Sequence, residues 1–527
     1  MKKIVFLSLL AVFFQSFLWL VIIPIWHTPD EQAHFGQVAF IAEKGRNPNS
    51  EDVNELTEEI YTSELLLGTA RDKVGNNKFT YHPEYRIEYT NSYNGLYEAS
   101  ISALSKSLAK KTFVHSEATR YPILYYLPAA TIYRLLYIHD LFVRVFSVRI
   151  WSLFLFMGTV YFTYKIGRLL FPEDKLLQIS PAILVGFQPM MVFANIGVNS
   201  DALGNLLFTI FLYQCVRTIL TDISIKNTAF FIIILSLSIY TKPQFIISVP
   251  LVVVIYIMIL FRDFYSKNNK LIFIGGSLFS ILVMISILYF FKGGPSSILY
   301  IFFSKFNFHS LLNFTANYTI FHTVREVFPW YWGVYDWLGV TYPRIVHRII
   351  NRIVIISIIG LILGVFRFFK SGSTYNRKVQ SIIFLSLTAF VYFVAISIYD
   401  WLSWYPGGFP LGVQGRYFFP VISVHMILLL LGIRELFPKK WGLKVIAIKF
   451  FCFGMLMLNY FGLYTVANTY YNVSSFSIFL MQVSQYKPWF MKGYFIIIWG
   501  LAAAIFIFLG IIYTSFTSSN KHVEYNK

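Results

Sequence analysis

Two adjacent carboxylates, Asp30 and Glu31, follow directly on the first hydrophobic stretch, residues 4–26. His34 lies one helical turn after Asp30, so the three side chains share a face if this segment is helical. An ionised carboxylate beside a membrane can accept a hydroxyl proton or bind a cation. The spacing predicts chemistry at the membrane surface, with Asp30 as a base or metal ligand and Glu31 assisting.

The same residues fit the start of a helix. Thr28 and Glu31 have the spacing of a capping box, and Pro29 suits the first helical position because its missing donor costs nothing there. The helix dipole favours acids at this end, so a purely structural role is the alternative for both carboxylates. The pattern predicts a helix that begins near Pro29.

The composition indicates which elements position these acids. The chain is 57% hydrophobic and 13% charged over 527 residues, with a mean hydropathy of +0.60, which is typical of a polytopic membrane protein. Uncharged runs approach the roughly 20 residues needed to cross about 30 Å of hydrocarbon. We therefore expect an all-α bundle. The first run lacks a small-residue cleavage site, so a retained span is predicted rather than a signal peptide.

About twelve spans are expected. The stretch 121–138 carries prolines and several tyrosines and is predicted to lie in the outer interface without crossing. The spans are 4–26, 149–165, 176–196, 202–216, 228–240, 245–261, 271–291, 349–366, 382–399, 417–433, 445–466 and 494–516.

The basic residues behind the net charge of +19 lie in short turns between these runs, as the positive-inside rule requires. This distribution does not indicate a nucleic-acid partner. Both termini are predicted to be cytoplasmic, and the active site extracytoplasmic. Cys215 and Cys452 both lie in apolar runs, which argues against a disulfide framework or a thiolate metal site.

Two long segments, 27–148 and 292–348, then face outward, and loops of this length are usually functional. The sequence shows no repeat or linker, so a single domain over 1–527 is predicted. Cations on the outer side are scarce, and a guanidinium is suited to hold a phosphate. The alternative for each is a side chain that extends to the lipid headgroups. The candidates are Arg416, Lys242, Arg325, Arg344, Arg348 and Arg352.

Asp201 has two interpretations. Residues 199–201, Asn-Ser-Asp, can cap the fourth span, or Asp201 can share the outer surface with Asp30. In the second case the two acids are candidate ligands for a divalent cation such as Mg²⁺ or Mn²⁺. Trp332, Tyr417 and His34 complete the predicted substrate-binding set, although interfacial aromatic belts have a similar composition.

The motifs, taken in order, resemble the GT-C superfamily of integral-membrane glycosyltransferases, and within it the branch known as domain of unknown function 2142. This branch has a Pro-Asp-Glu-x-x-His first loop, as at Pro29 to His34. The chain departs from it in having one proline before the Tyr pair and Asp336 in place of glycine. The other matching motifs are Pro122-Ile123-Leu124-Tyr125-Tyr126, Val148-Arg149, Asn199-Ser200-Asp201, Trp332-Gly333 and Gln414-Gly415-Arg416-Tyr417.

The resemblance implies transfer of a sugar from a polyprenyl-phosphate carrier to a glycan, lipid or protein acceptor of the cell envelope, with inversion at the anomeric carbon. A membrane-lipid donor also explains why no nucleotide-binding loop is apparent. The alternatives are a transporter or flippase of lipid-linked sugars and a non-catalytic glycan-binding membrane protein. A transporter ordinarily needs ionisable groups near the bilayer midplane, and the predicted spans contain few.

Overall fold

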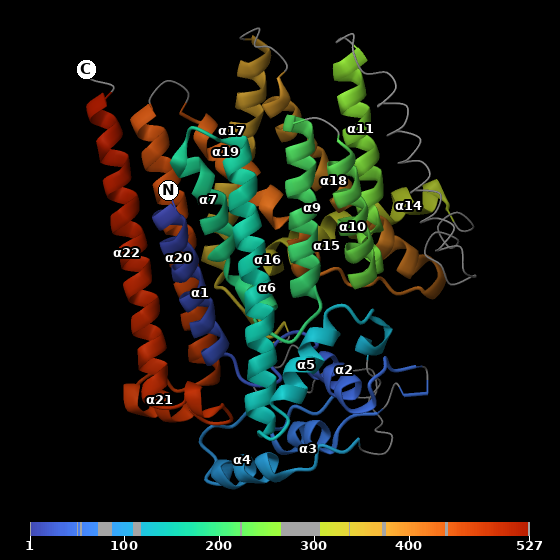
Figure 1. Cartoon of the computed structure of the whole chain (residues 1–527), viewed down its shortest axis with the longest axis vertical. Coiled ribbons are helices and arrows are strands. Elements are labelled where there is room, and N and C mark those ends of the chain that lie inside the picture. The colour runs from blue at the N-terminus through green and yellow to red at the C-terminus, as the bar shows by residue number, and fades with distance from the viewer. Residues whose placement is uncertain are drawn as a thin grey trace.

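The computed structural model describes residues 2–49, 51–52, 55–71, 87–108, 117–221, 224–264, 306–336, 338–370, 376–437 and 441–524. These residues are almost entirely helical (Figure 1). The strands that occur in them are a two-residue antiparallel pair, β1 (Val334–Tyr335) and β2 (Val340–Thr341), and one isolated bridge elsewhere. The all-α prediction is confirmed.

Eight helices of the described residues are long and apolar enough to cross a membrane, and a bent pair would make a ninth. Two further apolar helices, α10 (Ile225–Thr241) and α11 (Ser248–Phe264), are shorter and occupy the fifth and sixth predicted spans. The predicted span 271–291 lies outside the described residues. The eight are α1 (Lys2–Ile22), α6 (Leu141–Leu170), α9 (Asp201–Thr221), α17 (Arg344–Lys370), α18 (Arg377–Gly407), η5 (Gly415–Val421) with α19 (Ile422–Glu435), α20 (Trp441–Tyr470) and α22 (Tyr494–Glu524).

The third predicted span is the bent pair, α7 (Lys175–Gly186) and α8 (Pro189–Asn195), which meet at 59°. Pro189 cannot donate a backbone hydrogen bond, so the helix breaks before it. Asn459 of α20 donates to the Phe187 carbonyl at 3.0 Å, which satisfies an acceptor that the break leaves free. Its own oxygen accepts from Gln15 and Trp19 of α1, each at 2.9 Å. The backbone groups at the break are thus hydrogen-bonded within the bundle, as a break at membrane depth requires.

Burial separates central helices from peripheral ones. In α6, α9 and the span Gly415–Glu435, 67% of the most apolar window is buried, against 17% in α17 and α22. Peripheral helices still pack closely. Phe14 of α1 stacks on Phe506 of α22 at 4.9 Å, and a Cβ at Gly360 of α17 would lie 2.0 Å from the Gly432 oxygen of α19. Small residues allow such an approach.

The first long segment forms a helical lobe at one end of the bundle (Figure 1), made of α2 (Glu31–Lys44), α3 (Glu58–Leu66), α4 (Asn94–Ala103), η1 (Glu117–Arg120) and α5 (Tyr126–Leu135). The stretch predicted to lie in the interface contains the ten-residue α5, which is too short to span. Arg144 of α6 forms a buried ion pair with Glu59, and Tyr133 also donates to Glu59 at 3.2 Å. These contacts hold the lobe against α6.

Two smaller elements, η2 (Pro243–Ile247) and α11 (Ser248–Phe264), follow α10 (Ile225–Thr241). The second long segment contributes a helical run that includes two π-helical stretches: α14 (Phe308–Phe314), η3 (Thr315–Thr319), α15 (Ile320–His322), η4 (Thr323–Val327) and α16 (Phe328–Trp332). Its His322 bonds to the Val413 carbonyl at 2.8 Å. The loop before η5 is thereby attached to this run. Near the C-terminus, α21 (Phe476–Val483) and η6 (Trp489–Met491) precede α22.

Candidate active site at the junction of four segments

Asp30 is the residue before α2 and has a left-handed backbone, with φ 56° and ψ 19°. Aspartate is among the few residues other than glycine that tolerate this region. Its carboxylate makes no helix cap, and Oδ2 accepts a hydrogen bond from Arg416 Nη2 at 2.8 Å. The side chain is 30% exposed, whereas that of Arg416 is 8% exposed. The carboxylate is therefore paired but accessible.

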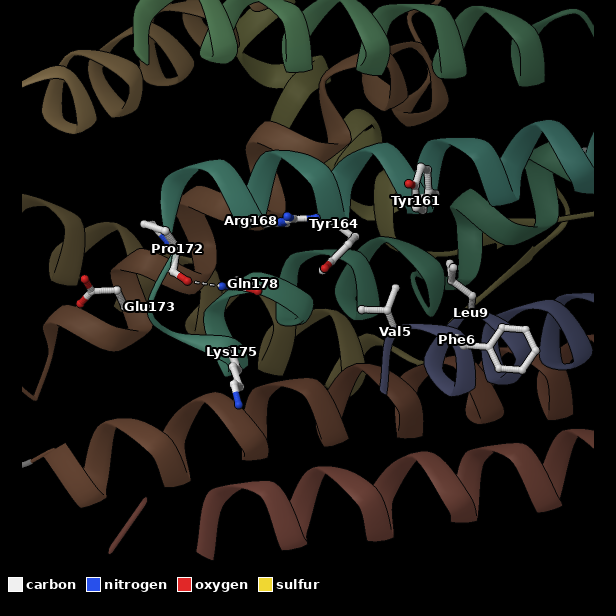
Figure 2. A pocket seen from close by; sticks show the side chains of 10 residues that line it. All are labelled: Val5, Phe6, Leu9, Tyr161, Tyr164, Arg168, Pro172, Glu173, Lys175 and Gln178. Carbon is white, nitrogen blue, oxygen red and sulfur yellow. Dashed lines mark hydrogen bonds between the residues drawn. The ribbon is translucent and has the colours of Figure 1, made fainter. Parts of the chain in front are cut away.

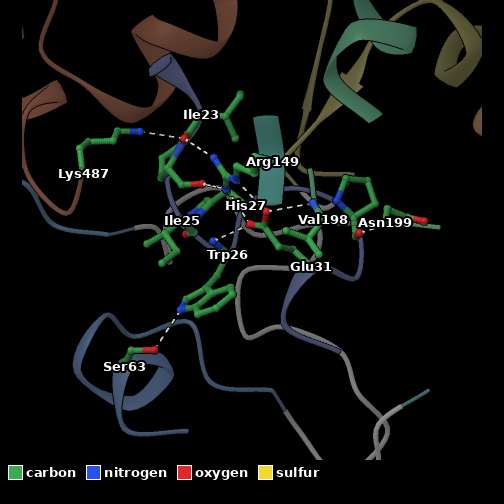
Figure 3. A network of polar contacts seen from close by, with 12 residues as sticks. Ile23, Ile25, Trp26, His27, Glu31, Ser63, Arg149, Val198, Asn199 and Lys487 are labelled. Atoms are coloured by element: carbon green, nitrogen blue, oxygen red, sulfur yellow. Dashed lines mark hydrogen bonds and ion pairs between the residues drawn. The ribbon is translucent and has the colours of Figure 1, made fainter. Parts of the chain in front are cut away.

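Glu31 is fully buried and points the other way. Its two oxygens accept from Arg149 Nε at 2.7 Å and Nη2 at 2.6 Å, and from the amides of Trp26 at 3.0 Å and Val198 at 3.3 Å (Figure 3). The predicted capping box with Thr28 is wrong. A buried guanidinium binds a carboxylate more strongly than a peptide N–H does. The Glu31 side chain therefore pairs with Arg149 and does not bond to the Thr28 amide.

Arg149 joins this carboxylate to the end of α1. Its Nη1 donates to the Ile23 carbonyl at 3.0 Å and its Nη2 to the Pro24 carbonyl at 2.7 Å. Lys487 donates to the same Ile23 carbonyl at 2.8 Å (Figure 3), and burial, with the nearby Arg149 charge, lowers the pKa of Lys487 well below its usual value. Carbonyls at a helix end have no partner within the helix. Here the side chains of Arg149 and Lys487 supply the donors and fix the chain between α1 and Asp30.

Asp201 begins α9, and its carboxylate forms an ion pair with Lys242, the residue that follows α10. The capping role belongs to Asn199, whose Oδ1 accepts from the Asp201 amide at 2.8 Å. Asn199 Nδ2 also donates to the Pro29 carbonyl at 3.2 Å. The loop before α9 is thus bound to the residue preceding Asp30, as the interpretation with both acids on one surface predicts.

His34 connects the two ion pairs. Its Nδ1 is 2.6 Å from the Tyr126 hydroxyl, and its ring stacks on Tyr121 and Tyr126 at 5.6 and 5.9 Å. Burial lowers the pKa of His34 to about 4, although the Asp30 charge opposes the shift, so the imidazole is neutral at pH 7. Lys242 Nζ lies 4.9 Å from the centre of the Tyr121 ring. We call Asp30, His34, Asp201, Lys242 and Arg416 the charged cluster.

The charged cluster has two carboxylates and two permanent cations, so its formal charges balance. Burial opposes ionisation of Asp30, but the charge and hydrogen bond of Arg416 lower the pKa of Asp30 below its usual value. Arg416 Nε and Nη1 are buried and have no hydrogen-bond partner within the described part of the chain. Buried donors in native proteins usually have partners. Among the described residues, two nitrogens of this fixed guanidinium, which together carry three N–H groups, therefore lack a partner, which an anion could provide.

Gly415 places Arg416. A Cβ at Gly415 would lie 2.1 Å from the Tyr331 amide nitrogen, so this approach requires glycine. The Tyr417 ring centre is 5.8 Å from the Arg416 guanidinium carbon. Trp332, predicted to bind substrate, is buried and packs against the ring of Tyr331 at 5.3 Å. The other candidate cations are exposed on the surface of the protein and lie outside the charged cluster: Arg325, Arg344, Arg348 and Arg352.

The predicted divalent cation stays a prediction. No group of three or more His, Cys, Asp or Glu that could hold a metal occurs among the residues described in the structure. Asp30 and Asp201 are each paired with a cation of the protein. Two carboxylates alone supply fewer oxygens than the six or more that such ions take, so we derive no step through a metal.

The sequence did not predict the part that three residues play in this region. Tyr121 links His34 to Lys242, Arg149 binds Glu31, and Asn199 binds the Pro29 carbonyl. Arg149 carried a usable signal, because a charge that close to an apolar run must be paired when it is buried. Its partner Glu31 is 118 positions away, and spacing alone does not reveal it. Tyr121 stands among many interfacial tyrosines and had no distinguishing signal.

Comparison with known proteins adds one family match and two structural similarities. The family model described as "Predicted membrane protein (DUF2142)" matches residues 13–424, more than half of the chain. No curated protein matches the sequence. The crystal structure of ArnT from Cupriavidus metallidurans bound to undecaprenyl phosphate is 12% identical, with a TM-score of 0.38, and the similarity covers 95% of this chain and 77% of that one.

The second solved structure is the oligosaccharyltransferase of Archaeoglobus fulgidus in its apo form. It is 10% identical, with a TM-score of 0.43. The similarity covers 92% of this chain and 56% of that one, so this chain spans little more than half of the archaeal protein's length.

Proposed function

The chain belongs to the DUF2142 family of predicted membrane proteins, and we propose that it is a glycosyltransferase that moves a sugar from a polyprenyl-phosphate carrier to a hydroxyl-bearing acceptor outside the cytoplasm. One observation carries the proposal. An accessible carboxylate, Asp30, is 2.8 Å from a guanidinium, Arg416, that has two further buried nitrogens, Nε and Nη1, without partners among the described residues. A base and an anion holder thus lie side by side at the end of the bundle.

The ion pair of Asp30 with Arg416 is the resting arrangement in this proposal. A phosphate that reaches Arg416 offers more negative charge than one carboxylate and can accept from the free N–H groups. Asp30 then loses its strongest partner and becomes available as a base. Lys242 stands near enough to supply a second positive charge, because it shares the charged cluster through Asp201 and Tyr121.

The proposed reaction is a single displacement. The acceptor oxygen attacks the anomeric carbon while Asp30 takes the proton of its hydroxyl group. The bond between the anomeric carbon and the phosphate oxygen breaks, and polyprenyl phosphate leaves with the electron pair. Arg416 stabilises the negative charge on the departing phosphate. Attack and departure on opposite faces invert the anomeric configuration, and the proton ends on Asp30.

Glu31 supports this chemistry without touching substrate. It is fully buried and bound by Arg149, whereas Asp30 belongs to the charged cluster and pairs with Arg416. We assign Glu31 the task of fixing the turn that aims Asp30. His34 is neutral and bonded to Tyr126, which suits it to orient a sugar hydroxyl more than to act as an acid.

The test is Asp30→Asn in purified protein supplied with polyprenyl-phosphate-linked sugars and membrane acceptors, with release of polyprenyl phosphate as the readout. We expect transfer to fall by at least about 100-fold, since general bases contribute on the order of 10² to 10⁴. The control is Asp52→Asn, which removes the Asp52–Arg46 pair elsewhere in the first long segment. That variant is expected to keep full transfer.

Two results would contradict the proposal. Unchanged transfer in Asp30→Asn removes Asp30 from the mechanism. Movement of intact lipid-linked sugar between leaflets of a vesicle, without release of polyprenyl phosphate, identifies a flippase.

A further inference from the structure

A cavity of the described structure lies far from the charged cluster. It has a volume of about 650 Å³ and is bounded by α1, α6 and α7 (Figure 2). Arg168, in the last turn of α6, contributes to its lining. Arg149, which fixes the turn before α2, belongs to the same helix, and the rise of 1.5 Å per residue places the two about 28 Å apart. The cavity is therefore roughly one hydrocarbon thickness away from the charged cluster.

One wall of this cavity is apolar and continues to the outside of the bundle. Val5, Phe6 and Leu9 come from the first half of α1, and Tyr161 faces them from α6 (Figure 2). The Phe6 side chain is 62% exposed and that of Tyr161 is 40% exposed. In a membrane such surfaces contact acyl chains, so the wall leads from the lipid into the cavity.

The other wall is basic. Arg168 and Lys175 line the cavity and are solvent-exposed, and neither has an ion-pair partner in the described part of the chain. Glu173 is the acidic residue of the lining, which leaves one net positive charge. A basic wall beside an apolar one matches a molecule with an anionic head and an apolar tail.

The turn between α6 and α7, which borders the cavity, is held by several hydrogen bonds and a close backbone contact. Gln178 donates to the carbonyls of Phe171 at 2.9 Å and Pro172 at 2.7 Å. Asp174 accepts from two amides in the first turn of α7, those of Leu176 and Leu177, at 3.1 and 3.0 Å. A Cβ at Gly167 would lie 2.4 Å from the Gln178 oxygen, so the two helices are in backbone contact. Arg168 and Lys175 are thus carried by a firmly held frame.

We propose that this cavity binds an anionic phospholipid of the leaflet opposite the charged cluster. Its phosphate contacts Arg168 and Lys175, and an acyl chain lies along Val5, Phe6 and Leu9. Basic pockets between membrane helices on the side of positive turns are suited to anionic headgroups. The site is independent of the proposed transfer reaction, and its test needs no activity.

Native mass spectrometry of the purified protein tests the proposal. The probes are phosphatidylglycerol, phosphatidylcholine and inorganic phosphate, each added to delipidated protein. We expect one phosphatidylglycerol to bind at least tenfold more tightly than phosphatidylcholine. In Arg168→Gln with Lys175→Gln this preference should fall on the order of tenfold, because each surface cation strengthens binding to anionic lipid several-fold.

The matched control is Arg217→Gln with Lys226→Gln, which removes two exposed cations at the end of α9 and the start of α10, outside the cavity. This control should keep the preference. A separate variant, Leu9→Trp, fills the apolar wall and should weaken phosphatidylglycerol binding with all charges present. Equal loss in the control, equal binding of phosphatidylcholine, or full displacement of the lipid by inorganic phosphate would overturn the proposal.

Discussion

Asp30 has a left-handed backbone, and its carboxylate does not cap the helix that follows. Asparagine tolerates the same backbone region, whereas alanine does not. The substitution to asparagine therefore changes the charge and leaves the turn intact. The neighbouring Trp26 also has a positive φ, 65°, and Glu31 holds it by accepting from its amide. Such positions are strained and persist where the surroundings fix them.

Arg416→Lys tests whether the N–H groups of the guanidinium matter as well as its charge. Lysine keeps the positive charge but lacks the planar set of donors. We expect the KM for the lipid-linked donor to rise about tenfold, with a smaller change in kcat, measured in steady-state transfer assays. Arg46→Lys in the exposed part of the lobe is the control and should behave as wild type. An unchanged KM in Arg416→Lys would remove the phosphate role of Arg416.

The pH dependence of stability reports on the buried histidines. Burial lowers the pKa of His34 to about 4 and that of His27 to about 3, whereas an unfolded histidine titrates near 6.5. As the pH falls from 6.5 to 4, the unfolded chain gains protons and the folded chain does not. The free energy of unfolding therefore decreases as the pH falls through this window.

His34→Gln removes one of these two contributions. The slope of the unfolding temperature against pH between 4 and 6.5, measured by thermal unfolding in detergent, should become shallower. His139→Gln alters an exposed histidine and is expected to leave the slope unchanged. An identical slope in His34→Gln and wild type would contradict the buried neutral imidazole.

At the scale of the elements, hydrophobic runs predicted most helices of the bundle, because long apolar segments have few alternatives in a membrane. They missed where α6 begins. The prediction started at Arg149, yet the helix starts at Leu141, where Asp140 caps it by accepting from the Val143 amide at 2.9 Å. Arg144 breaks the apolar pattern, and its distant partner Glu59 makes the charge tolerable inside the structure.

The pairing of Glu31 with Arg149 predicts a specific pattern of stability. Removing one partner leaves a buried charge unpaired, which costs about 3–5 kcal/mol. Glu31→Gln and Arg149→Met should each lower the unfolding temperature strongly, and the double variant should recover part of the loss. Arg46→Gln breaks a pair whose arginine side chain is 49% exposed, and we expect a change below about 1 kcal/mol. Additive losses in the double variant would argue against direct coupling.

At the scale of the whole molecule, the charged cluster is assembled from the start of α2, the start of α9, the end of α10 and the segment before α19. The alternation of predicted spans places all four on one side, and their contacts agree with that parity. The sequence could supply the sidedness and the residue types. It could not supply the pairing, because Asp30 and Arg416 are 386 positions apart.

Cysteine labelling can determine which end of the bundle faces the outside of the cell. In a background of Cys215→Ala with Cys452→Ala, we introduce Ser100→Cys in α4 or Thr221→Cys at the end of α9, both at exposed positions. A membrane-impermeant maleimide should label Ser100→Cys in intact cells and Thr221→Cys only after permeabilisation. The reverse pattern would place the charged cluster in the cytoplasm and refute the extracytoplasmic site.

The separation of Asp30 from Arg416 has a consequence for synthesis. A ribosome adds about 5–20 residues per second, so Asp30 waits on the order of tens of seconds before its counter-ion emerges. Arg149 emerges much sooner after Glu31, which is 118 positions before it. The turn that aims Asp30 can thus be fixed early by Arg149. The nascent chain still carries Asp30 without its counter-ion until Arg416 has emerged. A translational pause in that interval would expose an immature protein to quality-control proteases.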